Sequence, residues 1–143
     1  MTVDREKIRQ KLQFMRTELR ELERFRNMDI TEFKSEGLYE AAATRMLQVT
    51  IEALLDICAH VIAREGWGLP KTYGEAVEIA ARHGLIPSEM KDTYMAMVRF
   101  RNRVVHLYDE VDAAAVLDII HNHLGDFHPF IARVVQKYLS QAD

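Results

Sequence analysis

The sequence contains few of the residues that form turns and covalent cross-links. Its 143 residues include one cysteine, three prolines, six glycines and one tryptophan. An all-β fold of this length needs many more turn residues, so the composition argues against one. The single thiol, Cys58, allows neither an intramolecular disulfide nor a zinc site made of cysteines alone. One unpaired thiol is typical of a reducing compartment, and we expect a cytoplasmic protein.

Long apolar runs and a strong excess of one charge are also absent. No apolar run approaches the ~18 residues of a membrane span, and the opening segment MTVDREKIRQ is charged from residue 4 onward. We therefore expect neither membrane association nor a signal peptide. The chain carries 19 Lys and Arg against 22 Asp and Glu, a formal net charge of −3. Because general nucleic-acid coat proteins are basic overall, a nucleic-acid site in this chain must be a local patch.

The sequence does contain strong helical periodicity. Its hydrophobic fraction of 48% and charged fraction of 29% are those of a folded globular protein. Apolar residues recur in steps of three and four in residues 2–27, in residues 38–64, and from residue 109 or 112 to about residue 139. We predict a long helix in each segment. Pro129 should kink the last helix, because proline lacks the amide hydrogen and clashes with the preceding turn.

Shorter signals complete the predicted fold. Residues 28–37 interrupt the apolar pattern and are predicted to form a turn. The string Thr72-Tyr73-Gly74-Glu75 predicts a capping box that opens a short helix ending near His83. Ser88 is the predicted N-cap of a further helix that runs to about Val105. All 143 residues are thus expected to form a single all-α domain, an antiparallel bundle of four main helices plus a short one.

One segment stands out chemically: Arg99-Phe100-Arg101-Asn102-Arg103-Val104-Val105-His106-Leu107-Tyr108. Arginine binds phosphate oxygens bidentately, and a histidine with an ordinary pKa exchanges a proton at neutral pH. With an amide side chain to orient them, these groups suffice to cleave RNA without a metal. A base removes the proton of the ribose 2′-hydroxyl, which attacks the adjacent phosphate, while a cation stabilises the charge that develops.

The spacing of the motif residues by itself favours ordinary surface residues over a catalytic site. Exposed arginines on a helix usually face solvent, and the helix dipole by itself favours a histidine at a helix C-terminus. Geometry adds a constraint, because Arg101 and His106 point about 140° apart on an ideal helix. We expect them to meet over one substrate only if the helix unwinds near His106 or a second subunit supplies the complement. The acidic segment 109–112 is a plausible break.

Other histidines give no comparable signal. His121, His123 and His128 lie near Asp118 in the sequence, but His121 and His123 fall on different helix faces. No second carboxylate stands at ligand spacing, so we expect no metal site and no cofactor. His60, beside an apolar stripe, is expected to be structural.

The string Arg101-Asn102-x-x-x-His106-x-Tyr108 resembles the signature of HEPN domains, in which an arginine and a polar residue precede a histidine. Its ending, His-x-Tyr, is similar to the toxin subunit of HEPN–minimal nucleotidyltransferase toxin–antitoxin modules. The segment LQVTIEALLDICAH, residues 47–60, is similar to the second helix of that family. Tyr73-Gly74-Glu75-Ala76 opens a short helix as the family does, and chain length and helix order agree.

The resemblance implies a metal-independent endoribonuclease toxin that acts as a homodimer, with two copies of the motif facing each other across a cleft. Arg101 and His106 would be catalytic, and Asn102 would support them. Under the same interpretation, Arg99 and Arg103 would bind the RNA.

The resemblance also implies a partner and a modification. A cognate minimal nucleotidyltransferase antitoxin would silence the toxin by adenylylating Tyr108, because a bulky phosphorylated group would block a phosphate site by charge and volume. The alternative is a non-catalytic helical module that binds nucleotide or RNA, or that partners a nucleotidyltransferase, with the motif arginines used only for binding.

Overall fold

The computed structural model describes residues 2–106 and 111–140. Within these ranges every regular element is helical, which confirms the all-α class. The α-helices are α1 (Arg5–Leu22), α2 (Ile30–Ser35), α3 (Gly37–Glu65), α4 (Tyr73–Arg82), α5 (Lys91–His106), α6 (Ala113–Asn122) and α7 (His128–Val134). Short 3₁₀ turns lie at Glu23–Phe25, Ser88–Met90 and Leu124–Phe127, and a π-helical turn at Val135–Leu139.

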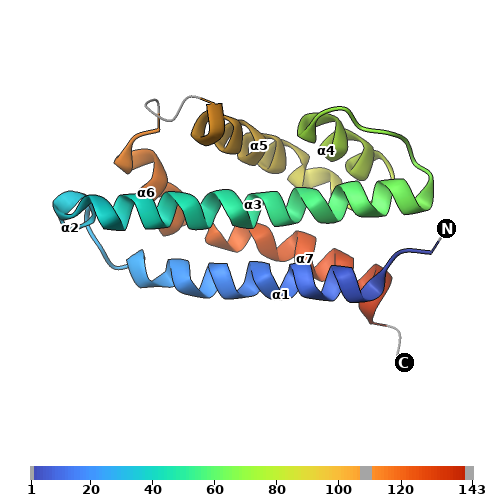
Figure 1. Cartoon of the computed structure of the whole chain (residues 1–143), viewed down its shortest axis with the longest axis horizontal. Helices are drawn as coiled ribbons and strands as arrows, with labels where there is room; N and C mark the ends of the chain where they lie inside the picture. Colours follow the sequence, from blue (N-terminus) through green and yellow to red (C-terminus); the bar gives the residue numbers. More distant parts are fainter. Residues whose placement is uncertain (1, 107–110, 141–143) are drawn as a thin grey trace.

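Helix α3 is the centre of the bundle. Figure 1 shows it crossing the middle of the molecule, with α1 along one side, α4 and α5 along another, and α6 and α7 behind. Among the described helices, α3 alone is long and apolar enough to cross a membrane by length and composition. However, 61% of its most apolar window is buried inside the protein, as expected for the core helix of a bundle.

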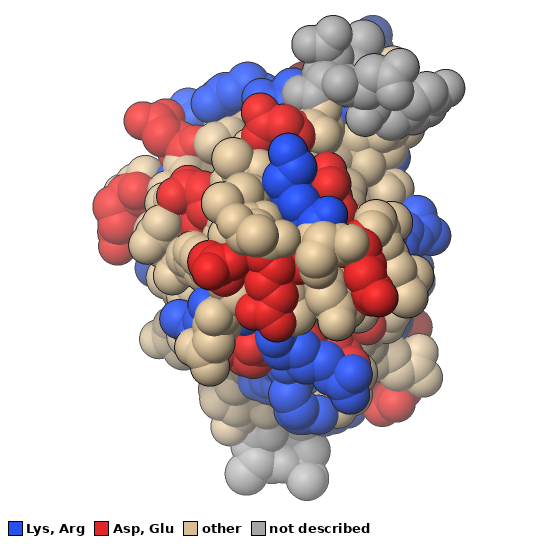
Figure 2. Space-filling view, turned by 90° about the vertical axis from the view of Figure 1, so that its left-hand side faces the viewer, with Lys and Arg blue, Asp and Glu red and all other residues tan. Residues whose placement is uncertain are grey.

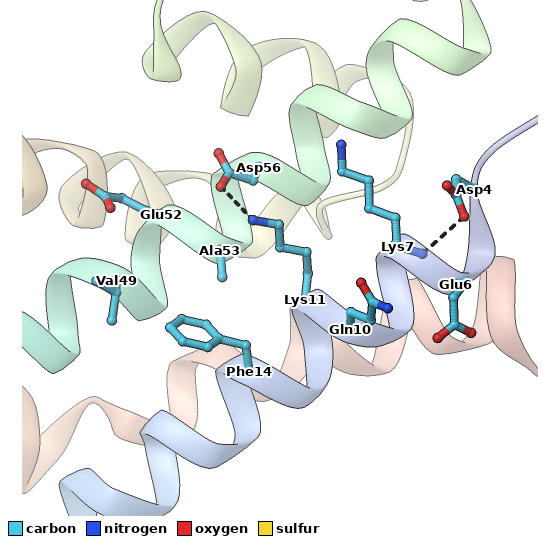
Figure 3. Close-up of a pocket in the computed structure, with 10 residues that line it drawn as sticks. All are labelled: Asp4, Glu6, Lys7, Gln10, Lys11, Phe14, Val49, Glu52, Ala53 and Asp56. Atoms are coloured by element: carbon cyan, nitrogen blue, oxygen red, sulfur yellow. Dashed lines mark hydrogen bonds and ion pairs between the residues drawn. The ribbon is translucent and has the colours of Figure 1, made fainter.

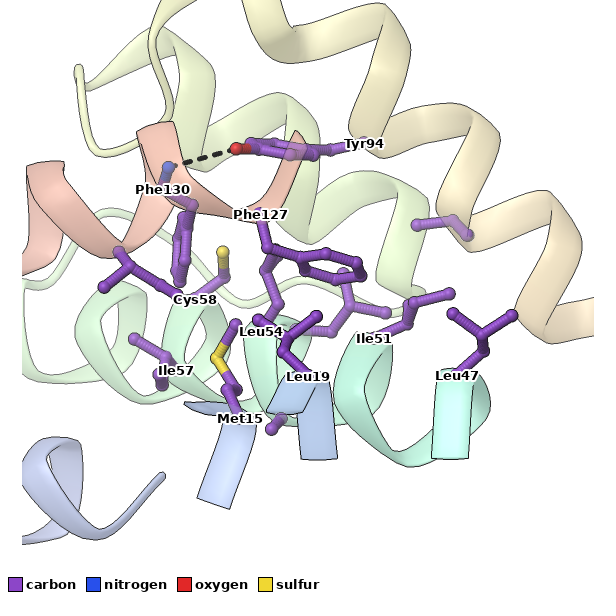
Figure 4. Close-up of a cluster of buried hydrophobic side chains, with 14 of the residues drawn as sticks. Met15, Leu19, Leu47, Ile51, Leu54, Ile57, Cys58, Tyr94, Phe127 and Phe130 are labelled. Carbon is purple, nitrogen blue, oxygen red and sulfur yellow. Dashed lines mark hydrogen bonds between the residues drawn. The ribbon is translucent and has the colours of Figure 1, made fainter. Parts of the chain in front are cut away.

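The core forms where the apolar stripes of the helices meet. The predicted stripe of α1 is buried at all five positions: Ile8, Leu12, Met15, Leu19 and Leu22. Figure 4 shows Met15 and Leu19 packed beside Leu54 of α3 and Phe127. Cys58 is fully buried in the same core, and this burial raises the pKa of its thiol.

The predicted capping box at the start of α4 is confirmed in one half and shifted in the other. The Thr72 hydroxyl accepts a hydrogen bond from the amide of Glu75 at 3.1 Å, as expected. The Glu75 carboxylate reaches one residue further back than a capping box requires and accepts from the amide of Lys71 at 2.8 Å. This second bond fixes the loop that leads into α4.

Two predictions near helix starts were wrong. Residues 28–37 contain the short helix α2, capped by Asp29 and anchored by the fully buried Phe33; a single apolar anchor is too little to produce a visible period. Ser88 does not cap α5, which begins at Lys91, because Ser88 lies within the 3₁₀ turn Ser88–Met90 that precedes the helix.

The predicted long last helix with a kink at Pro129 was also wrong. The chain leaves the helix at His123, where φ is −130°, and passes through a 3₁₀ turn into α7. Pro129 lies in the first turn of α7, where its missing amide hydrogen costs nothing. The break therefore precedes the proline and divides the segment into α6 and α7.

Tyr94 ties the break between α6 and α7 to the motif helix α5. Its hydroxyl donates to the carbonyl oxygen of Asp126 at 2.9 Å and accepts from the amide of Phe130 at 3.1 Å. The side chain is fully buried, and this burial raises the pKa of its hydroxyl. Figure 4 shows the bond to Phe130 at the edge of the core.

Replacing Tyr94 with Phe should lower the free energy of unfolding by about 1–3 kcal/mol, because the buried amide of Phe130 loses its acceptor. Urea unfolding followed by circular dichroism measures the change. Tyr39→Phe is the matched control, since the Tyr39 hydroxyl makes no hydrogen bond within the described residues, and it should change stability by less than about 0.5 kcal/mol. Equal stability of the two variants would contradict the prediction.

Candidate functional site

Three motif side chains reach one pocket on α5. Arg101, Asn102 and His106 line an open pocket with a volume of about 410 Å³. Its remaining lining comes from α3, from α4 and from the loop before α4, namely Ala59, Pro70, Lys71, Thr72, Tyr73 and Ala76. Because α5 stays helical through His106, bringing these side chains to one pocket requires no unwinding. The arginine side chain is long enough for Arg101 to reach the same pocket as His106, although the two residues point in different directions from the helix axis.

Arg101 is held from three sides. Its Nε donates to Oε2 of Glu52, on α3, at 2.8 Å. The guanidinium carbon lies 4.9 Å from the centroid of the Tyr73 ring, within the range of a cation–π contact. Its Nη1 donates to Oδ1 of the neighbouring Asn102 at 3.3 Å. Nη2 has no partner among the described residues, so Arg101 combines a fixed orientation with donors that a ligand can use.

Glu52 is a charged anchor for Arg101. Burial alone would raise the pKa of Glu52, but hydrogen bonds from Gln48 and Arg101 and the positive charges of Arg101 and Arg45 outweigh it. The net result is a pKa below the ordinary value, so Glu52 is ionised at neutral pH. Side-chain exposure is only 24% for Glu52 and 19% for Arg101, which limits the solvent screening of this pair.

His106 differs from Arg101 in that none of the described residues forms a hydrogen bond or ion pair with its ring. It is the last residue of α5 and is exposed. In the part of the chain that the structure describes, neither ring nitrogen forms a hydrogen bond. Both nitrogens are therefore accessible to a ligand, as proton exchange with a substrate requires.

Arg99 and Arg103 belong to a different pocket. They line an opening of about 480 Å³ between α5 and α6, on the other flank of α5. Both are exposed, and neither forms an ion pair within the described residues. The three arginines of the motif thus divide: Arg101 is held against α3 and α4, while Arg99 and Arg103 face outward.

The remaining sequence predictions have mixed outcomes. Tyr108 lies outside the described residues, as do the first two residues of the predicted break at 109–112. Asp112 caps α6 by accepting from the amide of Ala115 at 2.7 Å, which places the start of the last segment at the later of the two predicted positions. His60 is structural, and its Nε2 accepts from the amide of Asp4 at 3.0 Å. No three metal-ligating side chains are grouped for a metal in residues 2–106 and 111–140.

Glu52 and Tyr73 were not predicted as partners of Arg101, and Lys71 was not predicted as part of the pocket. Glu52 did leave a signal, because a carboxylate between the buried residues Ile51 and Ala53 needs a partner. Nothing in the sequence singles out Lys71, which the loop before α4 brings to the pocket.

A further groove adjoins the Arg101 site. It has a volume of about 750 Å³ and lies between α1 and α3, and Glu52 lines it. Figure 3 shows Lys11 of α1 reaching Asp56 of α3, at 3.2 Å, with Phe14 beside them. The lining mixes both charges, and Figure 2 shows the same mixture over one end of the molecule. A phosphate backbone finds no continuous basic field on these surfaces.

Comparisons with known proteins agree on one family. Residues 15–134 match the family model described as Ribonuclease HepT-like. The mRNA nuclease HepT of Shewanella oneidensis is 30% identical over 103 residues, which cover 72% of this chain and 77% of that protein. The tRNA nuclease HepT of Aphanizomenon flos-aquae is 26% identical over 132 residues, covering 92% of this chain and 89% of that protein.

Solved structures with the same fold include toxin–antitoxin complexes. A tri-AMPylated Shewanella oneidensis HEPN toxin in complex with MNT antitoxin has a TM-score of 0.83 and 25% identity, over 92% of this chain and 98% of that chain. A toxin–antitoxin with AMP-PNP has a TM-score of 0.81 and 25% identity, over 90% and 97% of the two chains. A cytosolic Bacillus subtilis protein of unknown function, YutE, shares the fold at 22% identity and a TM-score of 0.82, over 99% of this chain and 96% of that chain.

The Arg101–Glu52 pair should make stability depend on acid pH. Because folding lowers the pKa of Glu52 below its ordinary value of 4.5, the stabilisation is present above that pH and is lost as pH falls through the folded-state pKa. Glu52→Gln should therefore be less stable than wild type by about 1–2 kcal/mol at pH 7. The gap should close toward pH 3.

Urea unfolding of both proteins between pH 7 and pH 3 measures this gap. Glu78→Gln is the matched control, because the Glu78–Lys91 pair at 2.9 Å is more exposed and solvent screens it more strongly. A wild-type advantage that is the same at pH 3 as at pH 7 would show that the charge of Glu52 does not stabilise the fold.

Proposed function

This chain belongs to the Ribonuclease HepT-like family, and we propose that it is the endoribonuclease toxin of a toxin–antitoxin module in the cytoplasm. Curated relatives bear the names mRNA nuclease and tRNA nuclease, and similar solved structures are complexes of a toxin with its antitoxin. The observation that carries the proposal is the single pocket lined by Arg101, Asn102 and His106.

The proposed chemistry is metal-independent cleavage of RNA. The imidazole of His106 takes the proton of a ribose 2′-hydroxyl, and the 2′-oxygen attacks the adjacent phosphorus atom. The bond to the 5′-oxygen of the next nucleotide breaks, and that oxygen leaves with a proton from an imidazolium. The products are a 2′,3′-cyclic phosphate and a 5′-hydroxyl end. Arg101 stabilises the charge on the phosphate oxygens through Nη2, while Glu52 holds its Nε.

Asn102 has a supporting role in this scheme. Its side-chain oxygen accepts from Nη1 of Arg101, which favours one orientation of the guanidinium plane. A fixed guanidinium costs no reorganisation when charge develops on the phosphate. Arg99 and Arg103 hold neighbouring phosphates of the strand, because both are exposed and carry uncompensated charge within the described residues.

We further propose that the toxin acts as a homodimer, in which two copies of the motif face each other. His106 and Asn102 lie on the exposed side of α5, where a second copy can approach. A two-fold axis would then supply the second imidazole that the leaving oxygen requires. We expect light scattering to give about twice the 16.6 kDa mass of one chain.

Replacing His106 with Ala should lower RNA cleavage by about 10²- to 10⁴-fold, the usual contribution of a general acid–base group. Cleavage of total RNA with added chelator, together with growth after induction, measures the effect. His128→Ala is the matched control: His128 is exposed and lies outside both pockets of α5, and its loss should leave cleavage unchanged.

Full activity of His106→Ala, or a requirement for a divalent metal, would contradict the assignment of His106 as the general acid–base group of a metal-independent ribonuclease. A wild-type chain that binds RNA with His106-dependent affinity yet cleaves none of it would favour the non-catalytic binding module instead.

Regulation is proposed to pass through Tyr108. A nucleotidyltransferase antitoxin transfers AMP from ATP to the tyrosine oxygen: the bond between the α- and β-phosphates breaks, pyrophosphate leaves, and the hydroxyl proton is lost. The added phosphate then repels the RNA backbone at the arginines. Tyr108→Phe removes only the acceptor oxygen, so the variant should stay toxic and should escape an active antitoxin.

Mass spectrometry of the co-expressed wild-type protein should show AMP-sized additions on the peptide that contains Tyr108. Tyr39→Phe, which keeps Tyr108, should remain neutralised. If Tyr108→Phe is neutralised as well as wild type and no adduct forms, the antitoxin must act by covering the site.

A further inference from the structure

The pocket between α5 and α6 combines an apolar floor with a charged rim. Its floor includes Ile51, Met97, Phe100, Ala115, Ile119 and Phe127. Two of these side chains are aromatic, and the volume of about 480 Å³ admits one flat ring system. The pocket adjoins the motif, because Phe100 lies directly between Arg99 and Arg101 in the sequence.

The two edges of this pocket carry opposite charges. Arg99 and Arg103, four residues apart on α5, form the basic edge. On the opposite edge, His123 connects two carboxylates: its Nδ1 lies 3.0 Å from Oδ2 of Asp126 and its Nε2 lies 3.7 Å from Oδ2 of Asp118. Oδ1 of Asp126 accepts no hydrogen bond from the described residues, and its side chain is 32% exposed. The acidic edge therefore offers an acceptor to a ligand.

We propose that this α5–α6 pocket receives one nucleobase of the RNA, and that it selects a base with an exocyclic amino group: adenine, cytosine or guanine. The proposal deepens the proposed function and rests on it. A base packs against the apolar floor, where the part-exposed Met97, Ala115 and Ile119 can contact it. Its amino group donates to the carboxylate of Asp126, the pairing that aspartate makes with cytosine.

Uracil is disfavoured by the same edge. Its only ring donor stands between two carbonyl oxygens, and these oxygens would meet the carboxylates of Asp118 and Asp126. The arginine edge suits the other end of the nucleotide, since Arg99 and Arg103 can pair with the phosphate that carries the base.

The pocket lies close to the proposed cleavage point. Arg103 in this pocket and His106 in the other are three residues apart, and such residues are neighbours on a helix surface. A strand that crosses this side of α5 would place one phosphate at His106 and an adjacent one at the arginines. The selected base then belongs to a nucleotide at the scissile bond or to the nucleotide adjacent to it.

The experiment uses an RNA library with a randomised central segment, whose cut ends are sequenced. Two variants test the pocket. Asp126→Asn replaces one acceptor oxygen with a donor, and Ala115→Phe fills the pocket without changing a charge. Asp92→Asn is the matched control, because Asp92 is an exposed carboxylate on α5 outside the pocket. Circular dichroism checks that each variant is folded.

Wild type and Asp92→Asn should disfavour uracil by about tenfold or more at one fixed position near the cut. Both pocket variants should lose that preference while still cleaving RNA. Cleavage by wild type without any base preference, or a preference that both pocket variants retain, overturns the proposal. A change in the dimer mass of the pocket variants with an intact base preference would assign the pocket to a contact between copies.

A second measurement separates this proposal from the proposed function. Fluorescence anisotropy compares the affinities of oligo(A), oligo(C) and oligo(U) for the His106→Ala chain. Because this variant lacks the proposed catalytic imidazole, the measured affinities do not depend on cleavage. If wild type cleaves nothing but oligo(U) still binds about tenfold more weakly, and Asp126→Asn removes the difference, the base pocket stands and the nuclease assignment fails. Equal binding of all three strands overturns the pocket.

Discussion

Helix α3 must be covered over more than half of its circumference, and the rest of the fold follows from that constraint. Its buried residues span an arc of about 200° around the helix axis at 100° per residue, so no single neighbouring helix can remove them from water. Helix α1 covers one side, α4 and α5 another, and α6 and α7 a third (Figure 1). Burial of apolar surface contributes about 25 cal/mol per Å², and α1, α4, α5 and α6 all pack directly against α3.

Glu52 is one of the acidic residues through which this apolar helix forms an ion pair with a neighbouring helix; another is Asp56, which pairs with Lys11 of α1. A half-buried carboxylate needs a partner, and the partner is Arg101 from α5. The carboxylate that needs a partner for packing reasons therefore also orients Arg101, which has Tyr73 on one face and Asn102 beside it. Stability and site geometry depend on the same contact. Among the residues that the structure describes, His106 has no such anchor, and its side chain is exposed.

The break between α6 and α7 has a comparable double role. It lets α7 return along the core, and Tyr94 secures it from inside through Asp126 and Phe130. The same turn directs His123 and the Asp126 side chain toward α5. A continuous last helix, as the apolar period predicted, would have no turn to supply this edge. The motif helix is therefore flanked by two different pockets, one against α4 and one against α6.

The sequence by itself determined the helices whose apolar period is long, the core residues on them and the motif. The stripe of α1, the extent of α3 and the cap at Thr72 were all predicted, because each depends on neighbours within one or two turns. The resemblance of the motif led to the family.

The tertiary structure decided what depends on residues far apart in the chain. The pairing of Arg101 with Glu52 spans 49 positions, and no local pattern encodes it. The same holds for the division of the arginines between two pockets, since the flank that each occupies is set by α4 and α6. The break before Pro129 and the helix at 30–35 escaped prediction because a short helix is held by tertiary contacts rather than by its own period.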